Sequence, residues 1–82
     1  MEAHLTRDQY GIQYVAGTVR NNTSQVFMYV EVGFNAYDRS GNMIGNAWTN
    51  VANLGAHDTW SFQAIAPQGM FRWEFSEIQY TR

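Results

Sequence analysis

The side chains that could support catalysis or metal binding are few and widely separated in this 82-residue chain. Its two histidines are His4 and His57, and only His57 has an acidic neighbour, Asp58. Such a pair could relay a proton or supply two ligands to a metal ion, but neighbours in a turn point apart and no third ligand lies nearby in the sequence. We therefore interpret His57 as an exposed turn residue, and we predict a chain that is not an enzyme and holds no metal or cofactor.

One oxygen-rich loop, residues 38–42, has a weak similarity to calcium-binding loops. Such loops use several spaced acidic residues, whereas this one has only Asp38. We predict instead that the Asp38 carboxylate accepts backbone N–H groups of its own turn. The sequence also contains no glycine-rich phosphate loop, no nucleophile elbow and no cysteine, which excludes disulfides, thiol catalysis and cysteine-ligated zinc.

Aromatic residues offer a different chemistry, because exposed rings can stack on sugars or anchor a protein partner. Phe27 and Tyr29 alternate with the apolar residues of their segment, and Trp48 lies between a small residue and a polar one. One hypothesis is a binding surface for a carbohydrate or a peptide made by Phe27, Tyr29 and Trp48. The alternative is that these rings are covered within a small β-domain. Pairing of a partner with an exposed strand edge is a further binding route.

Charge limits the classes of partner. The formal net charge is −2, and all five basic residues are arginines spread along the chain. Because no cluster of them could neutralise a row of phosphates, we expect no nucleic-acid partner. No apolar run approaches the roughly 20 residues that a transmembrane helix requires, so we predict no membrane-spanning segment in this chain.

The elements that must position these side chains are predicted to be β-strands. Residues 26–38 form the longest alternating run, followed by a type I turn with Gly41 at its fourth position. Further strands are predicted over residues 10–20, 42–54, 59–66 and 70–80, with a bulge or close approach at Gly45 and a bulge near residues 76–77. The inward face of the central strand is predicted to comprise Val26, Met28, Val30, Val32, Phe34 and Ala36.

Two regions outside these strands bear on domain organisation. Residues 1–9 show no period, so we predict a flexible lead-in or linker end, followed by a single domain over residues 10–82. Residues 21–24 form a turn cluster that also contains overlapping glycosylation sequons at Asn21 and Asn22. Turn chemistry explains the cluster more simply, and glycosylation in a secreted protein is the alternative.

The chain resembles the FxLYD domain, a small immunoglobulin-like β-domain of exported bacterial and archaeal proteins. The similarity covers most of residues 15–64 and lies in residues 17–22, 29–32, 34–38, 40–45, 53–54 and 60–62. Its structural motif residues here are Phe34, Ala36, Tyr37, Asp38 and Gly41, with Ala36 in place of the leucine of the family name.

This resemblance implies a small antiparallel immunoglobulin-like β-sandwich in an extracellular or cell-envelope setting. It implies a non-enzymatic structural or interaction module of a larger exported protein, and it supplies no catalytic residues. The alternative function is the carbohydrate- or peptide-binding module built on the exposed aromatic residues.

Overall fold

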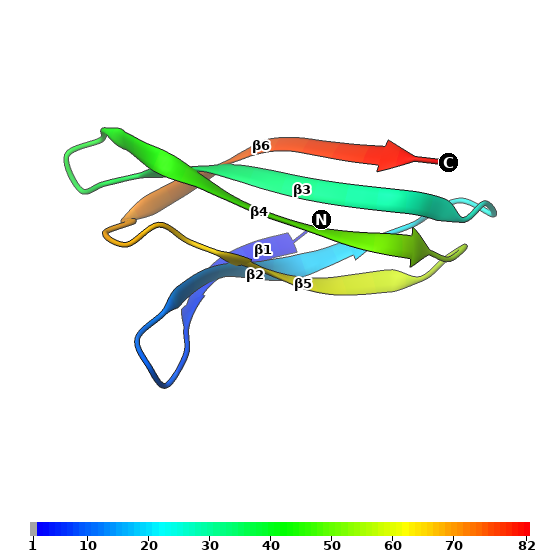
Figure 1. Ribbon diagram of the computed structural model, residues 1–82, viewed down its shortest axis with the longest axis horizontal. Coiled ribbons are helices and arrows are strands. Elements are labelled where there is room, and N and C mark those ends of the chain that lie inside the picture. The colour runs from blue at the N-terminus through cyan, green and yellow to red at the C-terminus, as the bar shows by residue number, and fades with distance from the viewer. Residues whose placement is uncertain (1) are drawn as a thin grey trace.

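Six antiparallel strands in two three-stranded sheets make up the structure, a computed structural model that describes residues 2–82. The strands are β1 (Glu2–Arg7), β2 (Gln13–Arg20), β3 (Phe27–Tyr37), β4 (Met43–Leu54), β5 (Thr59–Ile65) and β6 (Arg72–Thr81). One sheet has the order β1-β2-β5 and the other β4-β3-β6, and the two sheets lie face to face (Figure 1). The prediction of an all-β antiparallel sandwich is confirmed. Within residues 2–82, no helix is long and apolar enough to cross a membrane.

The core lies between the sheets and is centred on β3, which pairs with both β4 and β6. The Phe34 ring stacks with that of Phe62 from β5 at a centroid distance of 5.9 Å, so the two sheets interlock at this point. Four predicted inward residues of β3 are at most 1% exposed: Val30, Val32, Phe34 and Ala36. The other buried apolar side chains are Val15, Val19, Ala47, Leu54, Phe62, Ala64, Ala66 and Met70.

The start of β3 departs from the predicted face. Val26 and Met28 are 51% and 59% exposed, so their prediction as core residues is wrong. Phe27, rather than Met28, packs against the core, and it pairs with Leu54 of β4. Leu54 follows Asn53, whose φ of 58° lies in the left-handed region. This conformation interrupts the alternation of β4, so the two strands turn a different set of side chains inward at this end.

Ala36 is accommodated by a large neighbour on the adjacent strand. It lies opposite Trp73 of β6, and Trp73 packs against the core. The Trp73 ring meets the Phe34 ring edge-on at a centroid distance of 5.3 Å. The indole therefore supplies apolar bulk beside a residue with only one methyl group.

Both predicted irregularities of the sheet are present. Gly33 pairs with Glu77 while Phe34 pairs with Phe75, so Ser76 is the extra residue of a bulge in β6. A second register shift falls where β3 faces Gly45, which has a φ of 153°. The bulge in β6 is predictable because it changes the phase of the alternation, and the irregularity at Gly45 is predictable because a glycine inside a strand marks such a site.

Strand β1 corrects the predicted domain boundary. Glu2–Arg7 pairs with β2 from Thr18 to Gln13, so a flexible lead-in is wrong for these residues, while Met1 lies outside the described residues. Ala3 packs against the core from this edge strand. The sequence shows no clear alternation of apolar and polar residues over residues 2–7, because β1 is an edge strand with only two inward apolar side chains, Ala3 and Leu5.

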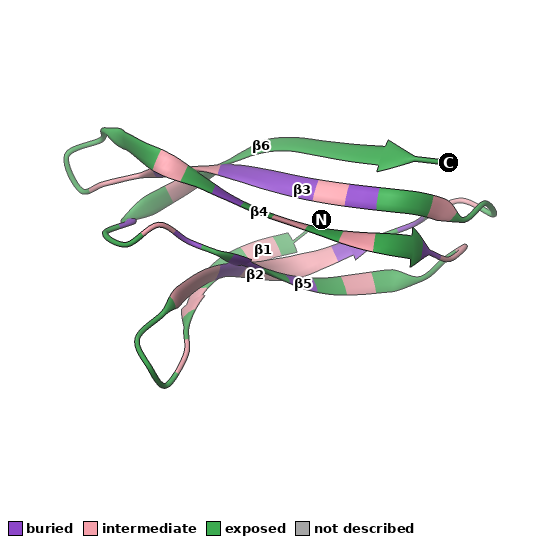
Figure 2. Ribbon diagram, viewed as in Figure 1, coloured by how far each residue is buried: buried purple, intermediate pink, exposed green. Residues whose placement is uncertain are grey.

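The two sheets end differently at their edges. Strand β6 is a free edge, and nine of its ten residues are exposed, so it appears green almost throughout in Figure 2. Its inward side chains are only partly covered, and Phe75, Ile78 and Tyr80 are 40–52% exposed. At this edge the sandwich is thus open, in contrast to the closed contact between β4 and β5.

Candidate binding surface on the outer sheet face

The outward face of the β4-β3-β6 sheet collects the polar and aromatic residues that point away from the core. Alternation along β3 places Glu31, Gly33 and Asn35 on this face. Pairing then places Trp48 of β4 on one side of Gly33 and Glu77 of β6 on the other. Three strands therefore meet around a residue without a side chain.

Gly33 opens a shallow hollow beside Trp48. A Cβ atom at Gly33 would lie 3.7 Å from Cγ of Glu77 and 4.0 Å from Cβ of Trp48, so the position has room for a methyl group but carries none. Trp48 is 59% exposed, which leaves much of the indole available for contact. The hollow has a volume of about 300 Å³ and is lined by Glu31, Gly33, Phe34, Asn46, Trp48, Ser76 and Glu77.

Hydrogen bonds hold the polar groups around this hollow in defined orientations. The Asn46 side-chain amide donates to Asn35 Oδ1 at 3.1 Å. On the opposite side, the Gln79 amide donates to Glu77 Oε2 at 2.9 Å. Each pair retains capacity to accept further hydrogen bonds, since an amide or carboxylate oxygen has more than one lone pair.

Tyr29 extends the same face toward the start of β3. Its hydroxyl donates to Glu31 Oε1 at 2.7 Å, and this hydrogen bond to a carboxylate raises the pKa of Tyr29 above its ordinary value. Tyr29 is 37% exposed and lies four residues from Gly33, about 13 Å along the strand at about 3.3 Å per residue. Tyr29 and Trp48 thus bound an extended strip rather than a compact pocket.

Phe27 lies apart from this strip. It is half-buried, packs against the core and stacks with Tyr80 of β6 at a centroid distance of 4.7 Å. The structure thus places two of the three aromatic residues, Tyr29 and Trp48, on one sheet face and the third elsewhere. Glu31, Gly33, Asn46 and Glu77 were not selected from the sequence as site residues. A glycine inside a strongly alternating strand was the signal that could have pointed to them.

The electrostatics of this face favour uncharged or cationic ligands. Glu31 and Glu77 carry negative charge at the hollow, and the lining contains no arginine. Arg72 lies farther along β6 and is paired with Glu74 at 2.7 Å. A phosphate or sulfate group would therefore meet carboxylates without a compensating cation.

The turn residues considered for chemistry have structural roles. Asp38 accepts backbone N–H groups of Ser40 and Asn42, each at 2.9 Å, as predicted. The bond from the Asn42 backbone is the main cause that lowers the pKa of Asp38 below its ordinary value. His57 is exposed in a turn with a φ of 62°, and residues 2–82 contain no group of three or more histidine and acidic side chains placed to hold a metal ion.

Asn21 is a buried turn residue rather than a surface sequon. It is 1% exposed, and its Nδ2 lies 2.7–3.2 Å from the carbonyl oxygens of Gln25, Leu54 and Gly55. Its Oδ1 accepts the backbone N–H of Thr23 at 3.0 Å. Because Nδ2 is the atom that a glycan would occupy, the folded domain excludes glycosylation at Asn21.

No protein-family model matches this chain, and neither the curated proteins nor the solved structures provide a match. Its function is therefore inferred from the geometry of the sheet face.

Proposed function

We propose that this domain is a non-enzymatic binding module of a larger exported prokaryotic protein, and that the outer face of its β4-β3-β6 sheet binds a neutral glycan. The observation that carries this proposal is the exposed indole of Trp48 beside the shallow hollow lined by Gly33. A large ring left in water among oriented polar groups is typical of a contact surface. The extracellular or cell-envelope setting rests on the resemblance to the FxLYD domain.

The chemistry of the strip matches a sugar chain. The apolar C–H face of a sugar ring stacks on an indole, and the ring's edge hydroxyls need donors and acceptors. Glu31, Glu77 and Asn46 supply these groups around Trp48. The distance to Tyr29 allows more than one sugar ring to lie along β3, which supports a chain rather than a single sugar as the ligand.

A second candidate function is capture of an extended peptide by the free edge of β6. Strand β6 has ten residues and pairs with β3 on one side only, so its outer edge offers backbone N–H and C=O groups that an added strand can use. The half-exposed side chains of Phe75, Ile78 and Tyr80 would then be covered by the incoming strand. This binding mode uses different residues from the glycan strip, so one titration separates the two.

The test is an NMR titration of the ¹⁵N-labelled domain with soluble neutral oligosaccharides and with peptides. The chain has three tryptophans, so their indole N–H signals report separately on exposed Trp48 and on half-buried Trp60 and Trp73. We expect saturable shifts at the Trp48 indole and at amides of Glu31 and Gly33. Shifts confined to amides of β6 would favour peptide capture, and no saturable shift at millimolar oligosaccharide would contradict glycan binding.

Two variants sharpen this experiment. Trp48→Ala should weaken glycan binding by about tenfold or more, which corresponds to about 1.4 kcal/mol. Tyr10→Ala is the matched control, because Tyr10 is 79% exposed on the hairpin between β1 and β2 and is no part of the strip. Equal weakening by the two substitutions would show that the binding is not specific to the strip.

A further inference from the structure

One end of the sandwich opens into a hollow between the two sheets. It lies among the β1–β2 hairpin, the loop after β3 and the loop between β5 and β6, which are together at the left of Figure 1. We refer to this hollow as the mouth. Its volume is about 850 Å³, within the range of small-molecule sites, and its lining includes Leu5, Arg7, Ile12, Arg39, Met70 and Phe71.

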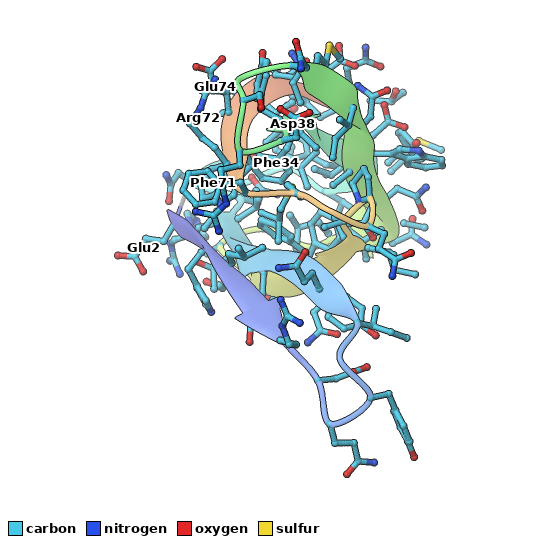
Figure 3. The ribbon with its side chains drawn as sticks, turned by 90° about the vertical axis from the view of Figure 1, so that its left-hand side faces the viewer. Glu2, Phe34, Asp38, Phe71, Arg72 and Glu74 are labelled. Carbon is cyan, nitrogen blue, oxygen red and sulfur yellow. The ribbon has the colours of Figure 1, made fainter. Side chains whose placement is uncertain are left out.

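The apolar surface of the mouth continues from the core. Met70 and Ala66 are 3% and 7% exposed, so they form its inner wall. Leu5, Ile12 and Phe71 are 38–53% exposed around the rim. Figure 3 looks at this end of the molecule and labels Phe71, with the β1–β2 hairpin projecting away from the two sheets. Apolar side chains left partly uncovered at a concave site favour an apolar ligand group.

Two arginines supply all of the formal charge of the lining. Arg7 comes from the end of β1 and Arg39 from the loop after β3, and the lining contains no aspartate or glutamate. Among residues 2–82, neither arginine has a carboxylate oxygen within 4.0 Å. The Arg39 guanidinium lies over the Phe71 ring, with Cζ 4.4 Å from its centroid, which places a positive charge beside the apolar rim.

The acidic neighbours of these arginines are engaged elsewhere. Asp8 accepts the backbone N–H of Tyr10 at 2.8 Å and of Ile12 at 3.0 Å with one oxygen, and the hydroxyl of Tyr14 with the other. Asp38 is occupied in the same way by its own turn. Each carboxylate thus stabilises its own loop by hydrogen bonds, and the guanidinium groups of Arg7 and Arg39 remain available to an anion.

The walls of the mouth are held in place by backbone hydrogen bonds. The Phe71 N–H donates to the carbonyl of Tyr37 at 2.8 Å, which ties the β5–β6 loop to the end of β3. The Ala66 N–H donates to the carbonyl of Gln13 at 2.9 Å, which ties the same loop to β2. A site whose walls are already joined loses little conformational freedom when a ligand binds.

From this geometry we infer that the mouth binds a small organic carboxylate with an apolar body, in the size class of a medium-chain fatty acid. The apolar body lies against Met70, Leu5 and Ile12, and the carboxylate pairs with Arg7 and Arg39. The combination of an apolar inner wall with two uncompensated guanidinium groups selects a ligand that carries both an apolar group and a negative charge. This site shares no residue with the glycan strip and does not depend on it.

Decanoate is the probe ligand. Decanol lacks the carboxylate and acetate lacks the long apolar chain, so these two compounds test the charge requirement and the apolar requirement separately. In the domain labelled with ¹³C at its methionine methyl groups, Met70 reports on the mouth, whereas Met28 and Met43 are exposed elsewhere. We expect decanoate to shift the Met70 methyl saturably without a matching change at Met28 or Met43. Decanol should bind at least about fivefold more weakly, and acetate should give no saturable shift.

Charge-removing variants test the two arginines. Arg7→Gln and Arg39→Gln should each weaken decanoate binding by about five- to tenfold, as expected for loss of a charge-assisted hydrogen bond. Arg20→Gln is the matched control, because Arg20 ends β2 at the opposite end of the sandwich and its guanidinium contacts Thr59. Decanoate affinity in this control should equal that of the unaltered domain.

Several results would overturn the inference. Equal affinity for decanol and decanoate would show that the carboxylate charge does not contribute to binding. If Arg20→Gln weakened decanoate binding as much as Arg7→Gln or Arg39→Gln, the effect of the arginines would be a general electrostatic one and not a contact in the mouth. Matching titration curves at Met28, Met43 and Met70 would show adsorption to any apolar surface. A short peptide with a free carboxylate and an apolar last residue that bound more tightly than decanoate would identify a chain terminus, not a fatty acid, as the ligand class.

Discussion

Two glycines in the strands should respond in opposite ways to the same substitution. At Gly17 of β2, an added Cβ would collide with the carbonyl oxygen of Glu2 and would lie 2.9 Å from Cα of Ala3. These are backbone atoms of β1, which pairs with Gly17, so no side-chain rotation relieves the clash. At Gly33 the nearest atoms are side-chain carbons at 3.7 and 4.0 Å, which is ordinary contact.

We expect Gly17→Ala to lower the free energy of unfolding by about 1–3 kcal/mol, the usual cost of overpacking. Gly33→Ala should raise it by about 0.5–1 kcal/mol, because alanine restricts the unfolded chain more than glycine and fits the strand without strain. The difference between the two variants is therefore about 1.5–4 kcal/mol from one identical chemical change.

Urea denaturation of both variants measures these free energies, and amide hydrogen exchange locates the damage. In Gly17→Ala, protection should fall first in Glu2–Arg7 and its partners on β2, while β3 stays protected. If Gly17→Ala were as stable as the unaltered domain and β1 kept its protection, the close approach of β1 to β2 would be refuted. A destabilised Gly33→Ala would refute the conclusion that a methyl group fits at this position.

Three further predictions concern the core and the turns. Phe34→Ala should cost about 3–5 kcal/mol in urea denaturation, because it removes a ring that is 1% exposed and contacts both sheets. Asn21→Ala should cost about 1–3 kcal/mol, because buried carbonyl groups lose their donor, whereas Asn22→Ala at the exposed neighbour should leave the urea midpoint unchanged. The carboxylate of Asp38 should stabilise the fold fully above its unfolded-state pKa of about 3.9, and this contribution should disappear as the pH falls through its lower folded-state pKa. The difference in urea midpoint between the unaltered domain and Asp38→Asn should therefore shrink below about pH 4, and a difference that is constant between pH 7 and pH 2.5 would contradict the role of the carboxylate.

Local patterns predicted most of the strand architecture. The alternation over residues 30–36 identified four residues that are buried in β3, and the phase change in the last strand located the bulge at Ser76. Asp38 followed its turn chemistry as well. These features depend on residues close together in the chain, so their physical causes are present in the sequence itself.

The errors fall where distant segments decide the outcome. Strand β1 was missed because its stability comes from pairing with β2 and not from its own alternation. Phe27 was expected to face outward, but a left-handed residue at the paired end of β4 accompanies a change in which side chains face the core. Strand β1 is a short strand at a sheet edge, and its few inward residues do not produce a visible alternation in the sequence.

The sequence by itself determined five of the six strands, β2 to β6, the turns between them and the absence of cysteine chemistry, because each follows from the types and spacing of neighbouring residues. Only the tertiary structure decided which strands share a sheet, and with that both candidate binding sites. Trp48, Gly33 and Glu77 meet because β4 and β6 flank β3, and Arg7 and Arg39 line one hollow because the β1–β2 hairpin and the loop after β3 lie at the same end of the sandwich. The proximity of residues that are distant in the sequence depends on strand order and register. Strand order and register follow from burial of the whole core, and no single stretch of the chain specifies them.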